Sequence, residues 1–186
     1  MKEKIQQLED EIRELCKNHK EEVKRAFWDF HIKPVIEISK EMAEKYDADI
    51  EVVWLSAILH GIARLNDEDP HDEIGAKKAE EILNSKGFSE EMIKKVSRGI
   101  LTHRCRKYLP ENLEEKILAS ADAISHFKVP FYLWHFKFSQ NKYVDIFSKN
   151  LEKIDRDFNE KIFFADEKEM IRKEYEVLIK WFEYEL

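Results

Sequence analysis

The scarcity of chain-breaking residues constrains this chain more than any other feature of its sequence. The 186 residues include four glycines and four prolines, and no window alternates apolar and polar residues over the length of a strand. Apolar residues instead recur at spacings of three and four, the pattern of helices that bury one face. The sequence therefore predicts an all-α protein, long enough for one well-buried domain and short for two.

Start and stop signals predict a series of helices along the chain. We expect them at about residues 2–24, 31–45, 50–59, 71–86, 89–103 and 110–126, with further helices in the aromatic-rich remainder. Asp49 and Ser89 are expected to cap two of them, and Asp166 the last one. We divide the chain into an N-terminal helix, residues 1–24, packed on a helical domain formed by residues 25–186.

The first expected helix carries a narrow apolar stripe made of Ile5, Leu8, Ile12 and Leu15. Packing of this stripe on the domain is the simpler interpretation, because a sustained coiled coil needs more heptads. A homodimer formed through this stripe, or through the aromatic C-terminal third, is the alternative.

The net charge of −7 and the pI of about 5.6 argue against binding to duplex nucleic acid or to an anionic membrane surface. No apolar stretch approaches the roughly 20 residues of a spanning helix, and the N-terminus lacks the layout of a signal peptide. We therefore expect a cytoplasmic protein. Cys16 and Cys105 lie far apart in no paired motif, so we interpret both as reduced packing residues.

Four titratable residues interrupt faces that should be buried: His31, His60, His103 and Asp122. Each alone has an ordinary explanation, a hydrogen-bonded core histidine or an aspartate that caps a neighbouring helix. Together the four residues suggest a metal site, because buried polar groups need partners and one metal ion satisfies several of them. Imidazoles and a carboxylate from separate helices suit a first-row divalent ion.

Three stretches of the sequence carry a family resemblance: FHIKPVIEISKEMAEKYDADIEVVWLSAILHGIARL, DPHDEIGAKKAEEILNSKGFSEEMIKKVSRGILTHR and KILASADAISHF. They resemble the HD-domain metal-dependent phosphohydrolases. The resemblance covers residues 27–127, followed by C-terminal helices in residues 128–186, and it implies an HD-type helical bundle. It also implies that His31, His60 and Asp122 are metal ligands.

The sequence departs from that pattern at Gly61, which stands where the family has the aspartate of an adjacent His-Asp pair. Gly61 is either a helix C-cap in a left-handed conformation or the position of a lost carboxylate ligand. Losing an anionic oxygen weakens metal affinity, so we expect one metal rather than two.

The resemblance implies that His71 and His103 face the cavity, where they bind either phosphate oxygens of the substrate or a second metal. Arg64 is a candidate to stabilise charge on the phosphate. Glu68 is a candidate to position the attacking water, with an acidic loop in solvent as its alternative. The expected cofactor is a divalent metal, Mn, Ni, Co, Fe, Mg or Zn.

The function implied is hydrolysis of a phosphate ester or anhydride in a nucleotide or another small phosphorylated metabolite, impaired by Gly61. A metal-poor ligand-binding or interaction protein is the alternative. An HD-type iron oxygenase is a third and weaker one.

Overall fold

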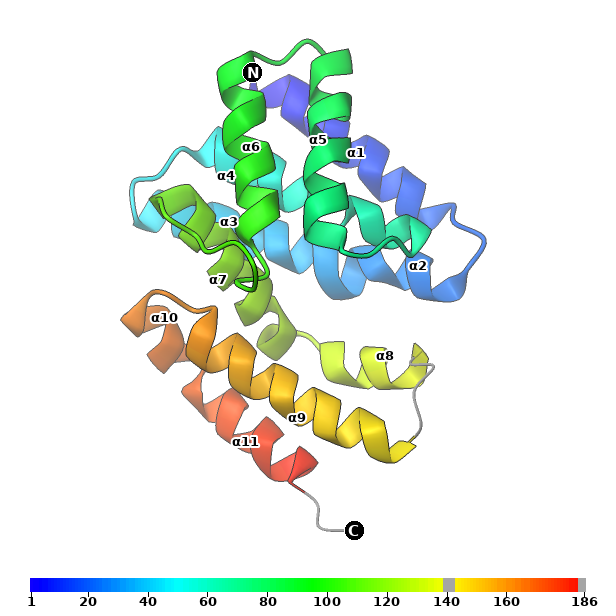
Figure 1. The fold of residues 1–186 in the computed structure, drawn as a ribbon, viewed down its shortest axis with the longest axis vertical. Helices are drawn as coiled ribbons and strands as arrows, with labels where there is room; N and C mark the ends of the chain where they lie inside the picture. The colour runs from blue at the N-terminus through cyan, green and yellow to red at the C-terminus, as the bar shows by residue number, and fades with distance from the viewer. Residues whose placement is uncertain (139–142, 184–186) are drawn as a thin grey trace.

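The computed structural model describes residues 1–138 and 143–183, and every regular element in those ranges is a helix (Figure 1). The predicted all-α class is therefore confirmed. The helices run as follows: α1 Lys2–Lys17, α2 Glu22–Phe27, the π-helix η1 Trp28–Ile32, α3 Lys33–Lys45, α4 Ile50–Leu59, the 3-10 helix η2 Ile62–Asn66, α5 His71–Ser85, α6 Glu90–Thr102, α7 Leu113–Lys128, α8 Phe131–Phe138, α9 Tyr143–Glu160, α10 Ala165–Met170 and α11 Arg172–Phe182.

Helix α4 lies at the centre of the hydrophobic core. Every residue from Val52 to Leu59 is buried, and α4 packs against α1, α3, α6 and α7. A helix that is apolar on all sides must be surrounded in this way. The Asp49 side chain caps α4 as predicted, accepting hydrogen bonds from the backbone N–H groups of Glu51 and Val52. The C-terminal end of α4 therefore delivers His60 to the interior of the protein.

The N-terminal segment differs from the single predicted helix over residues 2–24. Helix α1 ends at Lys17, and α2 and η1 follow it as separate elements. Residues Ile5, Leu8 and Ile12 are buried in the core of the same chain, whereas Leu15 is exposed and Cys16 takes its place. The apolar stripe therefore packs on α4 and on neighbouring helices of its own chain.

Two further helix boundaries also differ from the prediction. Helix α7 begins at Leu113 rather than near Pro110, because the Asn112 side chain caps it. Asp166 lies inside α10, where its carboxylate accepts a hydrogen bond from the Tyr46 hydroxyl at 2.6 Å instead of capping the last helix.

The C-terminal helices form their own layer beside α7, with α9 and α11 packed along each other (Figure 1). Among the described residues, no helix combines the length and the apolar character that crossing a bilayer requires.

Substituting Asp49 by Ala is expected to lower the free energy of unfolding by about 1 kcal/mol, because two N–H groups at the start of α4 lose their acceptor. Chemical denaturation measures the change. The control Asp49→Ser retains a capping oxygen and is expected to keep most of the stability. Equal losses in both variants would contradict the role given to the cap.

Candidate metal centre

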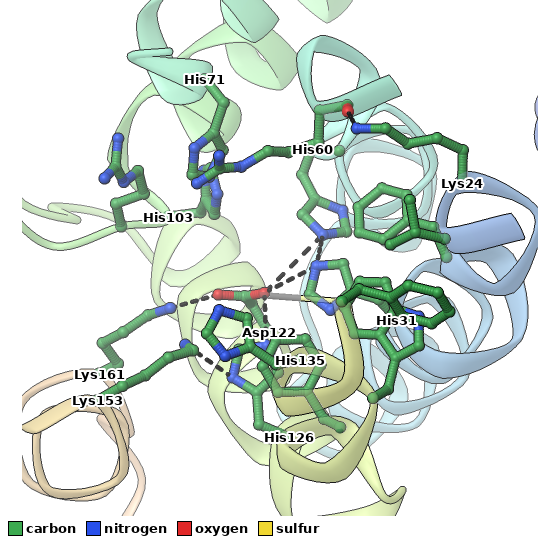
Figure 2. A pocket seen from close by; sticks show the side chains of 18 of the residues that line it. Lys24, His31, His60, His71, His103, Asp122, His126, His135, Lys153 and Lys161 are labelled. Carbon is green, nitrogen blue, oxygen red and sulfur yellow. Dashed lines mark hydrogen bonds and ion pairs between the residues drawn. The ribbon is translucent and has the colours of Figure 1, made fainter. Parts of the chain in front are cut away.

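Three side chains from separate elements meet in the interior: His31 from η1, His60 after α4 and Asp122 from α7 (Figure 2). The Nε2 atoms of His31 and His60 lie 2.9 Å apart. Asp122 Oδ1 lies 3.4 Å from His31 Nε2 and 3.9 Å from His60 Nε2. All three residues are buried. The structure thus brings together the three residues that the sequence singled out as ligands.

His126 joins this cluster one helical turn after Asp122. Its Nε2 atom lies 3.7 Å from Asp122 Oδ1, and donor atoms of His31, Asp122 and His126 all lie within 4.8 Å of one another. The opposite nitrogen, Nδ1, donates to Asp157 Oδ2 at 2.8 Å. A carboxylate that holds a histidine from behind fixes the ring as metal ligands require.

The protonation pattern of the cluster tests whether a cation fits. His60 Nδ1 lies 2.7 Å from the Ala57 carbonyl, which only accepts, so His60 Nε2 carries a lone pair in the neutral ring. The same reasoning gives His126 Nε2 a lone pair, and this buried atom has no hydrogen-bond partner among the described residues. Two imidazole lone pairs and Asp122 Oδ1 therefore converge, and His31 Nε2 is placed to donate a hydrogen bond only to His60 Nε2. This excess of acceptors suits a cation.

Burial keeps these imidazoles neutral. It lowers the pKa of His60, and it lowers the pKa of His126 to about 4 with the help of the Lys153 charge. Burial followed by the His60 charge holds the pKa of His31 well below its usual range. Neutral imidazole is the form that binds metal.

A lysine on the opposite side neutralises the carboxylate. Lys161, which directly follows α9, forms a buried ion pair with Asp122 Oδ2 and leaves Oδ1 to the imidazoles. Burial raises the pKa of Asp122, but Lys161 and the neighbouring imidazoles outweigh it and hold that pKa well below the usual range. Asp157, which is fully buried, binds Lys153 at 2.6 Å and approaches Lys161 at 3.8 Å.

Gly61 is not a left-handed cap, because its φ is −92° and its ψ is 1°. The interpretation of Gly61 as a left-handed C-cap is therefore wrong. Instead, the Phe27 ring fills the adjacent space: a Cβ atom on residue 61 would lie 2.8 Å from Phe27 Cε1 and 3.0 Å from Cζ. The same ring stacks on His31 with centroids 5.0 Å apart. An aromatic ring thus lies where a side chain of residue 61 would begin.

The other candidates from the sequence divide into two groups. Arg64, His71 and His103 line a cavity of about 550 Å³ that includes the cluster. Glu68 is not among the described residues that line it and instead pairs with Lys78. Arg104, which the sequence did not single out, lines the cavity and binds Asp72 at 3.0 Å.

Several cavity residues were missed from the sequence. They are aromatic or cationic and come largely from the C-terminal helices: Phe131, Trp134, His135, Lys153, Arg156 and Lys161. One sequence signal could have found some of them. Charged residues at 153, 157 and 161 repeat at helical spacing beside the apolar stripe of Ile154, Phe158 and Ile162.

This protein is thus an all-helical bundle in which histidines and an aspartate from separate helices meet in one cavity as a candidate metal centre. The chain belongs to the HD domain family, whose model matches residues 28–126. The crystal structure of a predicted HD superfamily hydrolase from an uncultured Thermotogales bacterium has the same fold, with a TM-score of 0.62 and 22% sequence identity. The match covers 95% of this chain and 87% of the hydrolase chain. The shared fold therefore extends into the C-terminal helices.

Curated relatives resemble one part of the chain. Two proteins named tRNA (cytidine(56)-2'-O)-methyltransferase, from Thermoplasma volcanium and Picrophilus torridus, are 33% and 32% identical over 104 residues, covering 50% of this chain and 30% and 29% of theirs. An uncharacterized protein from Methanocaldococcus jannaschii is 33% identical over 109 residues, covering 50% of this chain and 62% of its own. The chain thus spans less than two thirds of each relative.

Replacing Gly61 with Ala is expected to lower the free energy of unfolding by about 1–3 kcal/mol, the usual cost of overpacking a core, because the new methyl group collides with Phe27. Thermal or chemical denaturation measures this change. Gly75→Ala is the matched control. Its Cβ would meet Ile100 at an ordinary 3.5 Å, and Ala favours the helix by up to about 1 kcal/mol. A Gly61→Ala protein as stable as Gly75→Ala would contradict the role given to Phe27.

Proposed function

We propose that this protein is a metal-dependent phosphohydrolase that acts on a nucleotide or another small phosphorylated metabolite. The observation that carries the proposal is the excess of buried acceptors around Asp122 Oδ1, directly inside a cavity rich in cationic side chains. A volume of about 550 Å³ lies in the range typical of small-molecule sites. Membership of the HD domain family supports the same reaction class.

His31, His60, His126 and Asp122 would hold the divalent ion, whose identity, among Mn, Ni, Co, Fe, Mg and Zn, the donor set leaves open. When bound, such an ion polarises a phosphoryl oxygen and acidifies water. Asp157 keeps the His126 proton on Nδ1, so Nε2 stays available to the ion. Lys161 holds the second oxygen of Asp122 and so fixes the orientation of this carboxylate.

The chain supplies further groups for a bound phosphate. Arg64 lines the cavity and approaches Asp69 only at 3.8 Å, so its guanidinium is able to bind a phosphate oxygen. His71 and His103 face each other with ring centroids 5.3 Å apart. Burial lowers the pKa of His103 to about 3, and its Nδ1 lies 2.5 Å from the Ile100 carbonyl, so its Nε2 is a neutral acceptor for the proton of a water or of a protonated phosphate oxygen. The fixed positive charge of Arg64 stabilises the transition state of phosphoryl transfer.

The names of two relatives raise RNA as a source of the substrate phosphate. Those proteins are named as tRNA methyltransferases, and this chain spans less than a third of their length. We propose the shared segment as a phosphate-binding module and assign no methyl transfer to it. The substrate panel should therefore contain RNA termini beside free nucleotides.

The first experiment measures hydrolysis of phosphomonoesters, nucleotides and short RNAs by the metal-loaded protein. Asp122→Asn and His60→Gln are expected to lower kcat/KM about 100-fold or more, since altering groups that merely support ligands already costs 10- to 100-fold. The control His19→Gln, outside the cavity, is expected to keep full activity. If the loaded wild type hydrolyses nothing, or Asp122→Asn keeps full activity, the proposed function fails.

Lys161 gives a test that does not depend on turnover. Because its ammonium shares Asp122 with the proposed ion, Lys161→Met is expected to bind Mn²⁺ about 10-fold more tightly, the effect of removing a like charge at close range. Isothermal titration measures the affinity, and circular dichroism checks the fold. Lys33→Met, an exposed control, is expected to bind like the wild type. Weaker binding by a folded Lys161→Met protein would contradict this competition.

Two observations favour a second function, a ligand-binding module that works without metal. Lys161 already neutralises Asp122, and Phe27 fills the space beside Gly61. Metal titration separates the functions. Stoichiometric binding of an ion that depends on His31 and His126 supports the hydrolase. Nucleotide binding that is unaffected by metal and by substitution of His31 or His126 supports the ligand-binding module.

A further inference from the structure

The described lining of the cavity is more cationic than the chain as a whole. Seven lysines and arginines line it against two carboxylates, Asp67 and Asp122, although the chain carries a net charge of −7. Six of the seven have a carboxylate oxygen within 3.8 Å. Lys24 pairs with Asp67 and Lys161 with Asp122, and Lys153, Arg104 and Arg64 pair with acids just outside the lining.

Of the other two cations, Arg106 has no acidic partner among the described residues, and Arg156 shares Asp157 with Lys153 and Lys161. Arg106, in the segment between α6 and α7, makes no ion pair or side-chain hydrogen bond among the described residues. Arg156, on α9, only approaches Asp157 Oδ1, at 3.7 Å, an oxygen that Lys161 also approaches. Arg156 Nη1 is buried, and no described residue forms a hydrogen bond with it. Burial, followed by the charges of Arg156 and Arg104, lowers the pKa of Arg106. An anion between these groups would relieve their repulsion.

The arginine pair borders the metal centre. A single carboxylate, Asp157, contacts Arg156 on one oxygen and His126 on the other. Arg106 lies three residues after His103, which faces the same cavity. Because Asp157 joins Arg156 to His126 and both arginines line the same cavity, we expect a ligand with one phosphate at the cluster to direct its adjacent phosphate toward the arginines. Guanidinium binds phosphate through paired hydrogen bonds.

We propose that Arg106 and Arg156 form a second phosphate subsite, which selects substrates carrying a phosphate next to the one that reacts. This inference rests on the proposed function, because the cluster is taken to hold the reacting phosphate. The second phosphate comes either from the polyphosphate chain of a nucleotide or from the next phosphodiester of an RNA end.

The test compares binding of AMP, ADP and the 5'-phosphorylated diadenylate pApA, each used as its non-hydrolysable thiophosphate analogue, to Mn²⁺-loaded protein by isothermal titration. Wild type is expected to bind ADP or pApA about 10-fold more tightly than AMP. This preference is expected to fall to about 1 in Arg156→Met and in Arg106→Met. Arg156→Lys is expected to restore part of it, and Arg13→Met, on the exposed face of α1, to leave it unchanged. Thermal unfolding checks that each variant is folded.

The outcomes separate the two proposals and the two ligand sources. Tighter binding of ADP than of pApA assigns the subsite to a polyphosphate chain, and the reverse assigns it to an RNA end. Equal affinity for AMP, ADP and pApA, or a preference that survives both arginine substitutions, overturns the subsite even if the enzyme hydrolyses AMP. Arginine-dependent binding without hydrolysis of any panel member overturns only the hydrolase.

Discussion

The buried carboxylate of Asp122 is the group on which the architecture of the site depends. A buried charge is tolerated only when it is paired and hydrogen-bonded. One oxygen of Asp122 pairs with Lys161, and the other faces three imidazoles. These partners come from η1, the end of α4, α7 and the end of α9. The interactions of this one charge therefore connect residues 28–126, which match the HD family model, with the C-terminal helices.

The contact between Gly61 and Phe27 limits what the position after His60 can hold. A residue with a side chain at position 61 would collide with a ring that packs against His31 on one side and against Trp134, 6.0 Å away between centroids, on the other. Close-packed interiors do not absorb an added group at one position without a change nearby. Glycine and phenylalanine therefore form one packing unit, and a carboxylate at position 61 requires displacement of Phe27.

The C-terminal helices contribute side chains to the cavity as well as to the hydrophobic core. Asp157 contacts His126, Lys153 and Lys161, and so connects the candidate metal ligands to the cationic side of the cavity. Phe131 packs on His126 with ring centroids 3.9 Å apart. The C-terminal helices thus supply both the carboxylate that orients a ligand and the charges that surround it.

The sequence alone determined the helical class and the buried helix α4, and it put His31, His60 and Asp122 on buried faces, because helical periodicity shows which residues share such a face. That these three residues meet was implied only by the family resemblance, and the part of His126 in the cluster came from the structure. Only the tertiary structure decided that Lys161 meets Asp122 and that Phe27 fills the space at Gly61. These partners lie 39 and 34 residues apart in the chain, and periodicity within one helix carries no information about which distant side chain packs against it.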